Sequence, residues 1–349
     1  MNNKNETDFS YYLHRFFNEH LDAHRRVSIH TVESYSWTFA LLLEFFQAKM
    51  HLPPQKVAIH HISKDTVLEF LSWLEQERGN SLSTRNQRLT VIRSFFRYLQ
   101  TQRPEYMWLA SSVLSIKGSK VPKPAMNYLS HDGIKLLLEQ PDLSTMAGRR
   151  DMVLLSLLYD TAARVSEIIY VKAGDLMLSN PSSIRLTGKG QKTRLVPLMT
   201  QSVKHLKKYL SDMDLQGSEH SSDYLFVNRS HQPLTRGGVA YILKKYCDQV
   251  RQIHPEQMPD RFSPHCLRHS KAMHLLQAGN NLIYIRDILG HVDVSTTEIY
   301  AKADPEMKRH ALEKAYQEIT PSLPDWTADL KILSWLQTYK KRRNSDVKY

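Results

Sequence analysis

Cysteine is scarce in this sequence of 349 residues, which has only Cys247 and Cys266. Two cysteines, neither in a CxxC spacing, exclude a disulfide framework and a zinc finger. The longest apolar stretch, FALLLEFF at 39–46, is interrupted by Glu44 and is far too short to span a bilayer. The first residues, MNNKNETDFS, lack the apolar segment of a signal peptide. We therefore expect a soluble, cytoplasmic protein without a membrane partner.

Acidic residues are also few relative to basic ones. The sequence has 35 Asp and Glu against 47 Lys and Arg, a net charge of +12. Such an excess of positive charge favours a polyanionic partner, either a nucleic acid or an anionic membrane surface. The length is about twice that of a usual domain, so we expect two domains.

The first third of the chain has the apolar periodicity of helices. Helices are predicted at 28–46, at 62–77 with Ser63 as N-cap, and at 81–100. The last of these has one apolar face and a basic polar side, which is either simply solvated or a surface for DNA. The apolar face consists of Leu89, Ile92, Phe96 and Leu99, and the basic side of Arg85, Arg88, Arg93 and Arg97.

A stretch without periodicity, KGSKVPKPAMN at 117–127, contains two X-Pro steps that disfavour helix. We interpret it as a linker between a helical domain at 1–116 and a second domain. After it, one long buried helix is predicted at 150–171, and a β-hairpin at 182–198 with Lys189 at its tip between two glycines. Helical periodicity returns from Tyr241 onward.

Several polar residues of the second domain are ambiguous when taken singly. Arg164 could be an ion-pair partner of Glu167, Lys189 a solvated turn lysine, and His265 a core histidine. Their order along the chain is more informative than any one of them. The ordered set is Arg164, Lys189, His265, Arg268, His291 and Tyr300.

This order, in the segments LLYDTAARVSEI, TGKGQKTRLVPL, HCLRHSKA and ILGHVDVSTTEIYAK, resembles the tyrosine recombinase (phage integrase) family. The likeness is greatest to its Xer-like and mobile-element-encoded members. The sequence departs from the family pattern at Ala162, where glycine is common, and at Ala163. The resemblance implies a mainly α fold with a small antiparallel β-sheet. It implies a SAM-like core-binding domain at 1–116, a linker at 117–127 and an α+β catalytic domain at 128–320.

The chemistry of phosphodiester transfer explains why such residues are needed. Displacement at phosphorus adds negative charge to the nonbridging oxygens, and the planar forks of Arg164 and Arg268 match that geometry. Tyr300 is a suitable nucleophile because its phenolate is a better leaving group than an alkoxide, so the covalent step is reversible. An ammonium on a hairpin tip, Lys189, can protonate the departing 5′ oxygen.

The resemblance assigns the remaining roles. His265 would assist the deprotonation of Tyr300, and His291 would donate a hydrogen bond to a nonbridging oxygen. We expect Glu167 to orient Arg164 or His265. His269, beside Arg268, either donates a hydrogen bond that supports the catalytic residues or is a buried structural histidine.

The histidines also allow a metal site to be considered. His265 and His269 are four residues apart and could share a helix face, with His291 as a third ligand. The sequence HCLRH lacks the glutamate of HExxH, however, and an arginine beside a cation would oppose binding. We therefore expect a phosphate clamp that needs neither metal nor cofactor.

The sequence thus predicts a recombinase that cleaves and rejoins double-stranded DNA through a 3′-phosphotyrosyl intermediate. By resemblance, it would act as a homotetramer on paired sites through a Holliday junction, with or without a second recombinase, in DNA integration or transposition. Two alternatives remain, a type IB topoisomerase-like enzyme and a non-catalytic DNA-binding protein. Expected DNA contacts are Arg85, Arg88, Arg97, Lys117, Lys120, Lys123, Lys192 and Arg194.

The last segment, 321–349, has an apolar stripe at helical spacing. Its members are Trp326, Leu330, Leu333 and Leu336. We expect this tail to dock on a neighbouring protomer, as it does in relatives, although packing on its own chain is an alternative.

Overall fold

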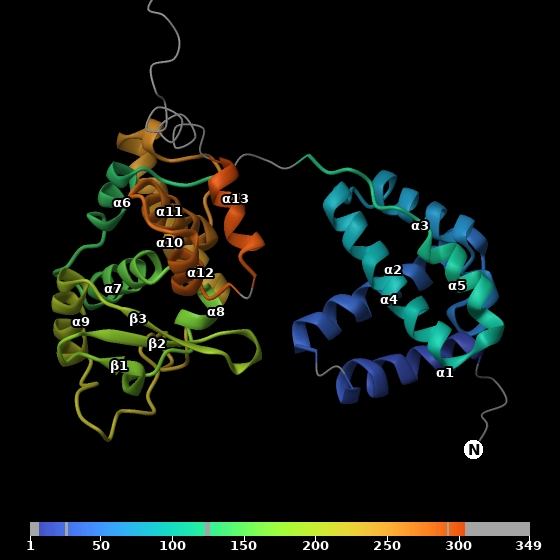
Figure 1. The fold of residues 1–349 in the computed structure, drawn as a ribbon, viewed down its shortest axis with the longest axis horizontal. Coiled ribbons are helices and arrows are strands. Elements are labelled where there is room, and N and C mark those ends of the chain that lie inside the picture. Colours follow the sequence, from blue (N-terminus) through green and yellow to red (C-terminus); the bar gives the residue numbers. More distant parts are fainter. Residues whose placement is uncertain (1–6, 25–26, 123–125, 292, 304–349) are drawn as a thin grey trace, which may run out of the picture. The chain divides into compact units, whose positions relative to one another are not determined.

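The computed structural model describes residues 7–24, 27–122, 126–291 and 293–303. The chain divides into two compact parts, an N-terminal unit, Met1–Pro124, and a C-terminal unit, Ala125–Tyr349 (Figure 1). Among the helices described, none is both long and apolar enough to cross a membrane. The predicted tail at 321–349 and Lys123 lie outside the described residues.

The N-terminal unit is built from helices. They are α1 (Asp8–Arg15), η1 (Phe16–His24), α2 (Ile29–Met50), η2 (Pro54–Lys56), η3 (Ile59–His61), α3 (Lys64–Gln76), α4 (Leu82–Gln102), η4 (Pro104–Tyr106) and α5 (Met107–Leu114). The three helices predicted from periodicity are confirmed as α2, α3 and α4. Ser63 accepts a hydrogen bond from the backbone amide of Thr66, which confirms it as an N-cap.

The core of this unit is aromatic. Phe9, Phe16, Phe39 and Phe95 are buried and contact one another, mostly edge to face. The predicted apolar face of α4 is confirmed, since all four of its residues are buried. These are Leu89, Ile92, Phe96 and Leu99.

The start of the predicted linker is attached to α4. The side-chain amide of Asn86 donates to the Ser119 carbonyl at 2.8 Å and accepts from the Ser119 amide at 2.9 Å. A side chain at Gly118 would meet Asn86 Oδ1 at 3.1 Å, so a residue without a Cβ allows this close approach. Residues 116–122 and 126–130 have no regular secondary structure.

The C-terminal unit combines helices with a small sheet. Its elements are α6 (His131–Leu138), α7 (Met146–Asp160), α8 (Val165–Ile168), η5 (Ala173–Asp175), β1 (Leu176–Met177), β2 (Ser183–Thr187), η6 (Lys189–Gln191), β3 (Thr193–Pro197), α9 (Thr200–Asp212), α10 (Arg236–Ile253), η7 (Pro255–Gln257), α11 (Pro264–Gln277), α12 (Leu282–Leu289) and α13 (Ser295–Ala303). Figure 1 shows the sheet on one side of this unit and α10, α11 and α12 gathered on the other.

The predicted hairpin is confirmed and extended by one strand. The sheet is antiparallel in the order β1-β2-β3, with Ile184 opposite Val196 and Thr187 opposite Thr193. Alternate residues of the hairpin, among them Ile184, Leu186 and Val196, are buried in the main core of the unit. The other face and the tip remain open to solvent.

The prediction of one long helix at 150–171 is wrong. Helix α7 ends at Asp160, and α8 begins only at Val165, because the chain turns at Ala162 with a left-handed φ of 49°. The Thr161 hydroxyl donates to the Leu157 carbonyl and accepts from the Ala163 amide, which satisfies backbone groups at the break. The residues are apolar and buried on both sides of the turn, so periodicity alone did not reveal it.

A second, smaller core of the C-terminal unit lies where α11, α12 and α13 meet. It contains Ala162 from the break after α7, Met273 from α11, Leu289 from α12 and Tyr300 from α13. The break and the three helices therefore converge on the predicted nucleophile.

Candidate active site

Arg164 stands at the beginning of α8, directly after the break. Its guanidinium donates from Nη1 to Glu167 Oε1 at 2.7 Å, and its backbone amide donates to Glu167 Oε2 at 2.9 Å. The arginine side chain is 33% exposed and the glutamate side chain 2%. The buried carboxylate of Glu167 thus orients the guanidinium of Arg164, part of which stays accessible to solvent, as expected.

Arg194 of β3 binds the same carboxylate from another side. Its Nη2 lies 2.8 Å from Glu167 Oε2 and its Nη1 lies 3.1 Å from Oε1. Burial would raise the pKa of Glu167, but hydrogen bonds and charge from Arg194 and Arg164 outweigh it and hold that pKa below its usual value. A side chain at Gly188 would lie 2.9 Å from Glu167 Oε1, so the hairpin needs glycine beside this ion pair.

The expectation that Arg194 is free to contact DNA needs correction. Its side chain is 12% exposed, and its Nε donates to the Ile288 carbonyl at 2.9 Å. Arg194 therefore connects β3 to α8 and α12. Strand alternation could have indicated this, because Arg194 shares a face with the buried Val196 and lies opposite the buried Leu186.

Arg268 of α11 is 4% exposed. Its Nη1 and Nη2 donate to the carbonyls of Ala162 and Leu289, each at 2.7 Å. Burial and the nearby charge of Arg164 lower the pKa of Arg268 to about 10, so it remains a cation at neutral pH. The turn at Ala162 supplies one of its two carbonyl partners, which explains why the break matters for the site.

Tyr300 of α13 is 1% exposed, and its hydroxyl lies 3.0 Å from Nδ1 of His269. Burial raises the pKa of Tyr300, while the positive charges of Arg268 and Arg164 act in the opposite direction. The effect of both arginines on this hydroxyl indicates that the two cations and the tyrosine belong to one cluster.

His291 follows α12 and lies beside Tyr300. The two rings are parallel within 2°, with centroids 6.5 Å apart, and His291 Nδ1 is 3.0 Å from Thr297 Oγ1. Burial, followed by the charges of Arg268 and Arg164, lowers the pKa of His291 to about 4. His291 is therefore neutral at physiological pH. Thr297, which sets its orientation, was not among the predicted residues and has no distinctive sequence signal.

His265 lies in the first turn of α11 and is exposed. Partial desolvation, followed by the charges of Arg268, Arg164 and Arg236, lowers its pKa. The histidine that shares a hydrogen bond with the Tyr300 hydroxyl is His269, one turn later on the same helix. The two histidines therefore differ in that His269 contacts the tyrosine hydroxyl, whereas His265 is exposed.

Lys189 begins the turn between β2 and β3, as predicted. The turn contains Gly190 and Gln191, both with positive φ, and its Lys192 is exposed. The side chain of Lys189 lies outside the described residues.

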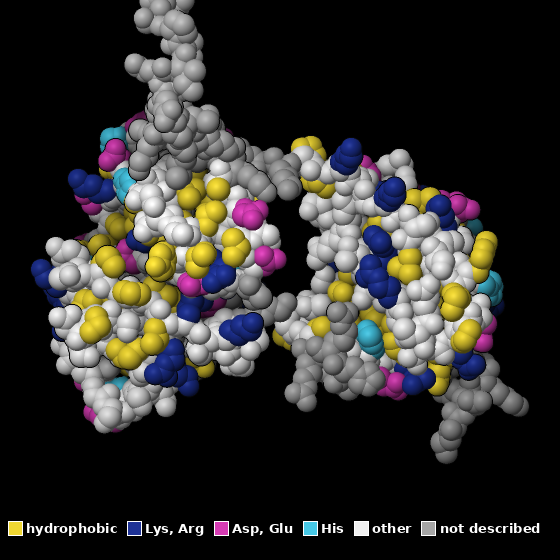
Figure 2. Space-filling model, viewed as in Figure 1, with side chains coloured by type: hydrophobic (Ala, Val, Ile, Leu, Met, Phe, Trp, Pro, Cys, Tyr) yellow, Lys and Arg dark blue, Asp and Glu magenta, His cyan; other side chains and the backbone are white. Residues whose placement is uncertain are grey.

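The candidate DNA contacts of the N-terminal unit differ in accessibility. Arg97, Lys117 and Lys120 are exposed. Arg88 is instead partly buried and donates to the Ser34 carbonyl and the Thr38 hydroxyl of α2. Arg85 donates to Ser119 Oγ at 2.9 Å and pairs with Glu75. Figure 2 shows Lys and Arg side chains gathered on one face of this unit, over α2 and α4.

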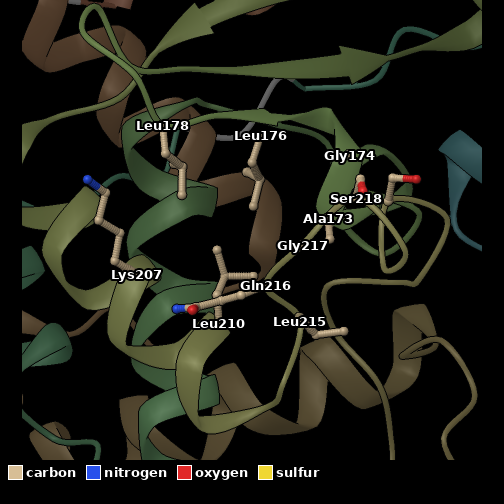
Figure 3. Close-up of a pocket in the computed structure, with 11 residues that line it drawn as sticks. Ala173, Gly174, Leu176, Leu178, Lys207, Leu210, Leu215, Gln216, Gly217 and Ser218 are labelled. Atoms are coloured by element: carbon tan, nitrogen blue, oxygen red, sulfur yellow. The ribbon is translucent and has the colours of Figure 1, made fainter.

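A hollow of about 490 Å³ lies apart from these residues, between the sheet and α9 (Figure 3). Leucines 176, 178, 210 and 215 line it together with Lys207 and the loop at 216–218. None of the predicted site residues contributes to it. Within the part of the chain that the structure describes, no group of three or more His, Cys, Asp or Glu side chains could hold a metal ion.

Residues 127–307 match the model of the phage integrase family, and residues 15–103 match that of the phage integrase N-terminal SAM-like domain. The tyrosine recombinase XerC of Pelotomaculum thermopropionicum is 31% identical over 307 residues, which cover 86% of this chain and 95% of the relative. A putative integrase/recombinase, y4rC, of Sinorhizobium fredii is 35% identical over 302 residues, which cover 86% of this chain and 90% of the relative.

Two solved structures show the same fold. The XerH site-specific recombinase bound to a palindromic difH substrate has a TM-score of 0.66 at 23% identity, with 84% of this chain and 82% of that chain covered. The Tn1549 transposon integrase in complex with transposon right end DNA has a TM-score of 0.67 at 16% identity, with 88% and 99% covered.

Proposed function

The chain belongs to the phage integrase family of tyrosine recombinases, enzymes that break and rejoin DNA, and we propose that Tyr300 is its nucleophile. The observation that carries this assignment is the cluster around the Tyr300 hydroxyl. The hydroxyl shares a hydrogen bond with His269, and the positive charges of Arg268 and Arg164 act to lower its pKa. A phenol in this position is next to the cations that a phosphate would need.

The two arginines would bind the nonbridging oxygens of the scissile phosphate. Each is oriented by protein acceptors, Arg164 by Glu167 and Arg268 by two carbonyls. Preorganised donors of this kind stabilise the charge that develops in the transition state without reorganising during the reaction. Neutral His291 would add a hydrogen bond at the same phosphate.

The reaction would proceed by attack of Tyr300 on phosphorus. The Tyr300 oxygen forms a bond to phosphorus as its proton passes to His265, the acceptor that the family resemblance implies, and the bond from phosphorus to the 5′ oxygen breaks. Lys189 on the hairpin turn would donate a proton to that leaving oxygen. The phosphotyrosyl bond conserves the energy of the phosphodiester, so the incoming 5′ hydroxyl of another strand can reverse the step without metal or nucleotide.

Because Tyr300 is 1% exposed, α13 would have to shift to present the hydroxyl to DNA. Helix α13 contacts α11 and α12, and its packing rests on a small core that includes Met273 and Leu289. A small core of this size makes a local opening less costly than disruption of the main core.

Double-stranded DNA is the proposed partner, bound by both domains. We assign core binding to residues 1–116, a linker to 117–127, catalysis to 128–320 and protomer docking to 321–349. The exposed candidates for backbone contacts are Arg97, Lys117, Lys120 and Lys192. The charge of +12 is consistent with such a partner, and the enzyme would act in the cytoplasm.

We propose recombination between two sites by a homotetramer, through a Holliday junction, with or without a second recombinase. A type IB topoisomerase would use a similar cluster but would rejoin the same strand. The two functions differ in whether protomers assemble on paired sites and exchange strands. Identity of 31% to a tyrosine recombinase over most of the chain favours recombination.

The assignment of Tyr300 is tested with the Tyr300→Phe variant and a nicked DNA substrate that traps the covalent complex. The variant lacks only the hydroxyl oxygen, so it should bind DNA with nearly native affinity and form no adduct that resists denaturant. Tyr159→Phe is a matched control. The Tyr159 hydroxyl also shares a hydrogen bond with a histidine of α11, His274, but it lies outside the cluster around Tyr300. A covalent adduct in Tyr300→Phe would refute the assignment, and Tyr316 would be examined next.

A further inference from the structure

The hollow between the sheet and α9 has leucine walls that water reaches. Figure 3 shows Leu176 and Leu178, from β1 and the residues after it, on one side, and Leu210 and Leu215, from α9 and the loop after it, on the other. Leu210 is buried, but the other three leucines are only half-buried, with part of each side chain packed on the main core. The hollow therefore presents apolar surface that the described residues leave uncovered, as is typical of an interaction site.

The two ends of the hollow differ in character. Lys207 of α9 lies at one end, whereas Gly174 and Ser218 lie near the other (Figure 3). At this second end the Gly174 amide donates to the Ser221 carbonyl at 3.0 Å, and a side chain at Gly174 would meet that oxygen at 2.7 Å. A backbone contact thus closes one end of the hollow, and a lysine borders the other.

Lys207 belongs to a row of three exposed lysines on α9. Lys204, Lys207 and Lys208 are three and four residues apart, so they share one face of the helix. The acidic residue of α9, Asp212, is engaged by Arg149 at 2.6 Å. Among the described residues, no carboxylate lies within ion-pair distance of the three lysines. The lysine row is thus an uncompensated positive charge beside an apolar hollow.

This combination decides between three kinds of ligand. The sugar-phosphate backbone of DNA would contact the lysines but has no apolar group to fill a hollow lined by leucines. A small amphiphilic anion would fill the hollow but would reach only Lys207, the one lysine that lines it. Lys204 lies almost one helical turn away along α9, about 5 Å. A peptide segment with both apolar and acidic side chains is long enough to contact the hollow and the whole row.

We propose that the hollow and the lysine row form a docking site for an acidic, leucine-containing peptide segment of a partner protein. Leucine-sized side chains enter the hollow between its two pairs of leucines, and carboxylates of the same segment pair with Lys204 and Lys207. The carboxylate of Glu219 lies against Gly217 at the loop end, so the acidic residues of the segment lie over α9 instead. None of the proposed active-site residues lines the hollow, so a docked partner leaves that site free.

A random peptide library displayed on phage tests this site on the full-length protein. Phage are selected on the native protein after depletion on Leu178→Glu, which places a carboxylate among the leucines. Leu178 is half-buried, and thermal unfolding checks that the variant is folded. The enriched peptides should combine leucine-like side chains with an excess of aspartate and glutamate. Leu195→Glu is the matched control and should retain these peptides, because Leu195 is 61% exposed on the opposite face of the same sheet.

Charge variants then measure what the lysine row contributes to the affinity of a selected peptide, by fluorescence polarisation. Lys204→Glu and Lys207→Glu should each weaken binding by about 10-fold, because each replaces an attraction by a repulsion. Lys135→Glu makes the same charge change at an exposed lysine of α6 and should have little effect. A deficit in Lys207→Glu without one in Lys204→Glu would reject the peptide segment and indicate a small anion.

DNA binding and cleavage separate this site from the proposed function. Lys204→Glu combined with Lys207→Glu should bind DNA with the native salt dependence and, per folded molecule, cleave it at the native rate. A reduced salt dependence in this double variant would assign the lysines to DNA and overturn the docking site. A selection in which no enriched peptide distinguishes the native protein from Leu178→Glu would overturn it as well. Because the peptide measurements use no DNA, their outcome does not depend on which tyrosine is the nucleophile.

Discussion

Glu167 carries its charge where water hardly reaches it. Its side chain is 2% exposed, and Arg164 and Arg194 bind its two oxygens. Such an ion pair contributes little compared with a well-packed apolar group, but removing one partner leaves a buried charge without compensation. Glu167 therefore couples the stability of this part of the protein to the orientation of Arg164.

Glu167→Gln should lower the free energy of unfolding at neutral pH by about 3 kcal/mol. The folded-state pKa of Glu167 lies below its unfolded value, so its stabilisation is complete above the unfolded pKa. It is lost as pH falls through the folded pKa. The stability curves of native and variant protein should therefore converge in acid, as measured by denaturant unfolding across pH.

Two further variants control this experiment. Glu139→Gln neutralises an exposed glutamate at the end of α6 and should change stability little. Glu167→Gln combined with Arg194→Met removes both members of one pair, so it should cost less than the sum of the single changes. Additive losses would show that Arg194 and Glu167 do not depend on each other.

In the β2–β3 hairpin a fixed position lies directly beside the turn, because Arg194 is one residue beyond the Thr187–Thr193 pair that closes it. Arg194 ties β3 to α8 and α12, while the turn at 189–191 contains two residues with positive φ. A proton donor on this turn would be held near the phosphate because Arg194 fixes the adjoining strand. A lysine there could equally bind a phosphate without donating a proton.

Replacement of the bridging 5′ oxygen by sulfur separates these two roles of Lys189. A thiolate leaves without protonation, so Lys189→Ala should cleave ordinary DNA far more slowly than the native enzyme but the thio substrate at a similar rate. Lys192→Ala, in the same turn region, is the matched control and should show the same modest deficit on both substrates. Arg164→Ala should show no recovery. Equal deficits of Lys189→Ala on both substrates would make Lys189 a binding residue.

At the scale of the whole molecule, an excess of positive charge is distributed over both units. Figure 2 shows Lys and Arg both over α2 and α4 and on the side of the C-terminal unit that carries the sheet. If both units bind the same duplex, many phosphates are neutralised at once. Binding would then release many counterions and depend steeply on salt.

The salt dependence of DNA binding should therefore have a slope of log K against log salt of about −0.9 for each phosphate contact. Lys120→Ala should reduce the magnitude of the slope by about 1, as expected for the loss of a single contact. Lys244→Ala is the control, because Lys244 on α10 pairs with Asp248 and is not a proposed contact. A native slope equal to one or two contacts would contradict binding by both units.

The sequence by itself determined helices α2, α3 and α4 of the N-terminal unit, the hairpin and the family, but not α1, η1 or α5. Periodicity places apolar residues such as Leu89 and Phe96 on one face whatever the helix packs against, and turn glycines mark the hairpin locally. The ordered residues from Arg164 to Tyr300 indicated the chemistry because each residue type suits one part of phosphoryl transfer. These features depend on local order along the chain.

Only the tertiary structure decided the break at Ala162, the ion pair between Arg194 and Glu167, and which histidine of α11 contacts Tyr300. The turn at Ala162 is invisible in a pattern of buried residues, yet it brings a carbonyl to Arg268. His265 and His269 are the same residue type on one helix, so local sequence cannot tell which of them contacts Tyr300. What separates them is the position of α13, which places Tyr300 within 3.0 Å of His269 through packing between residues 31 positions apart.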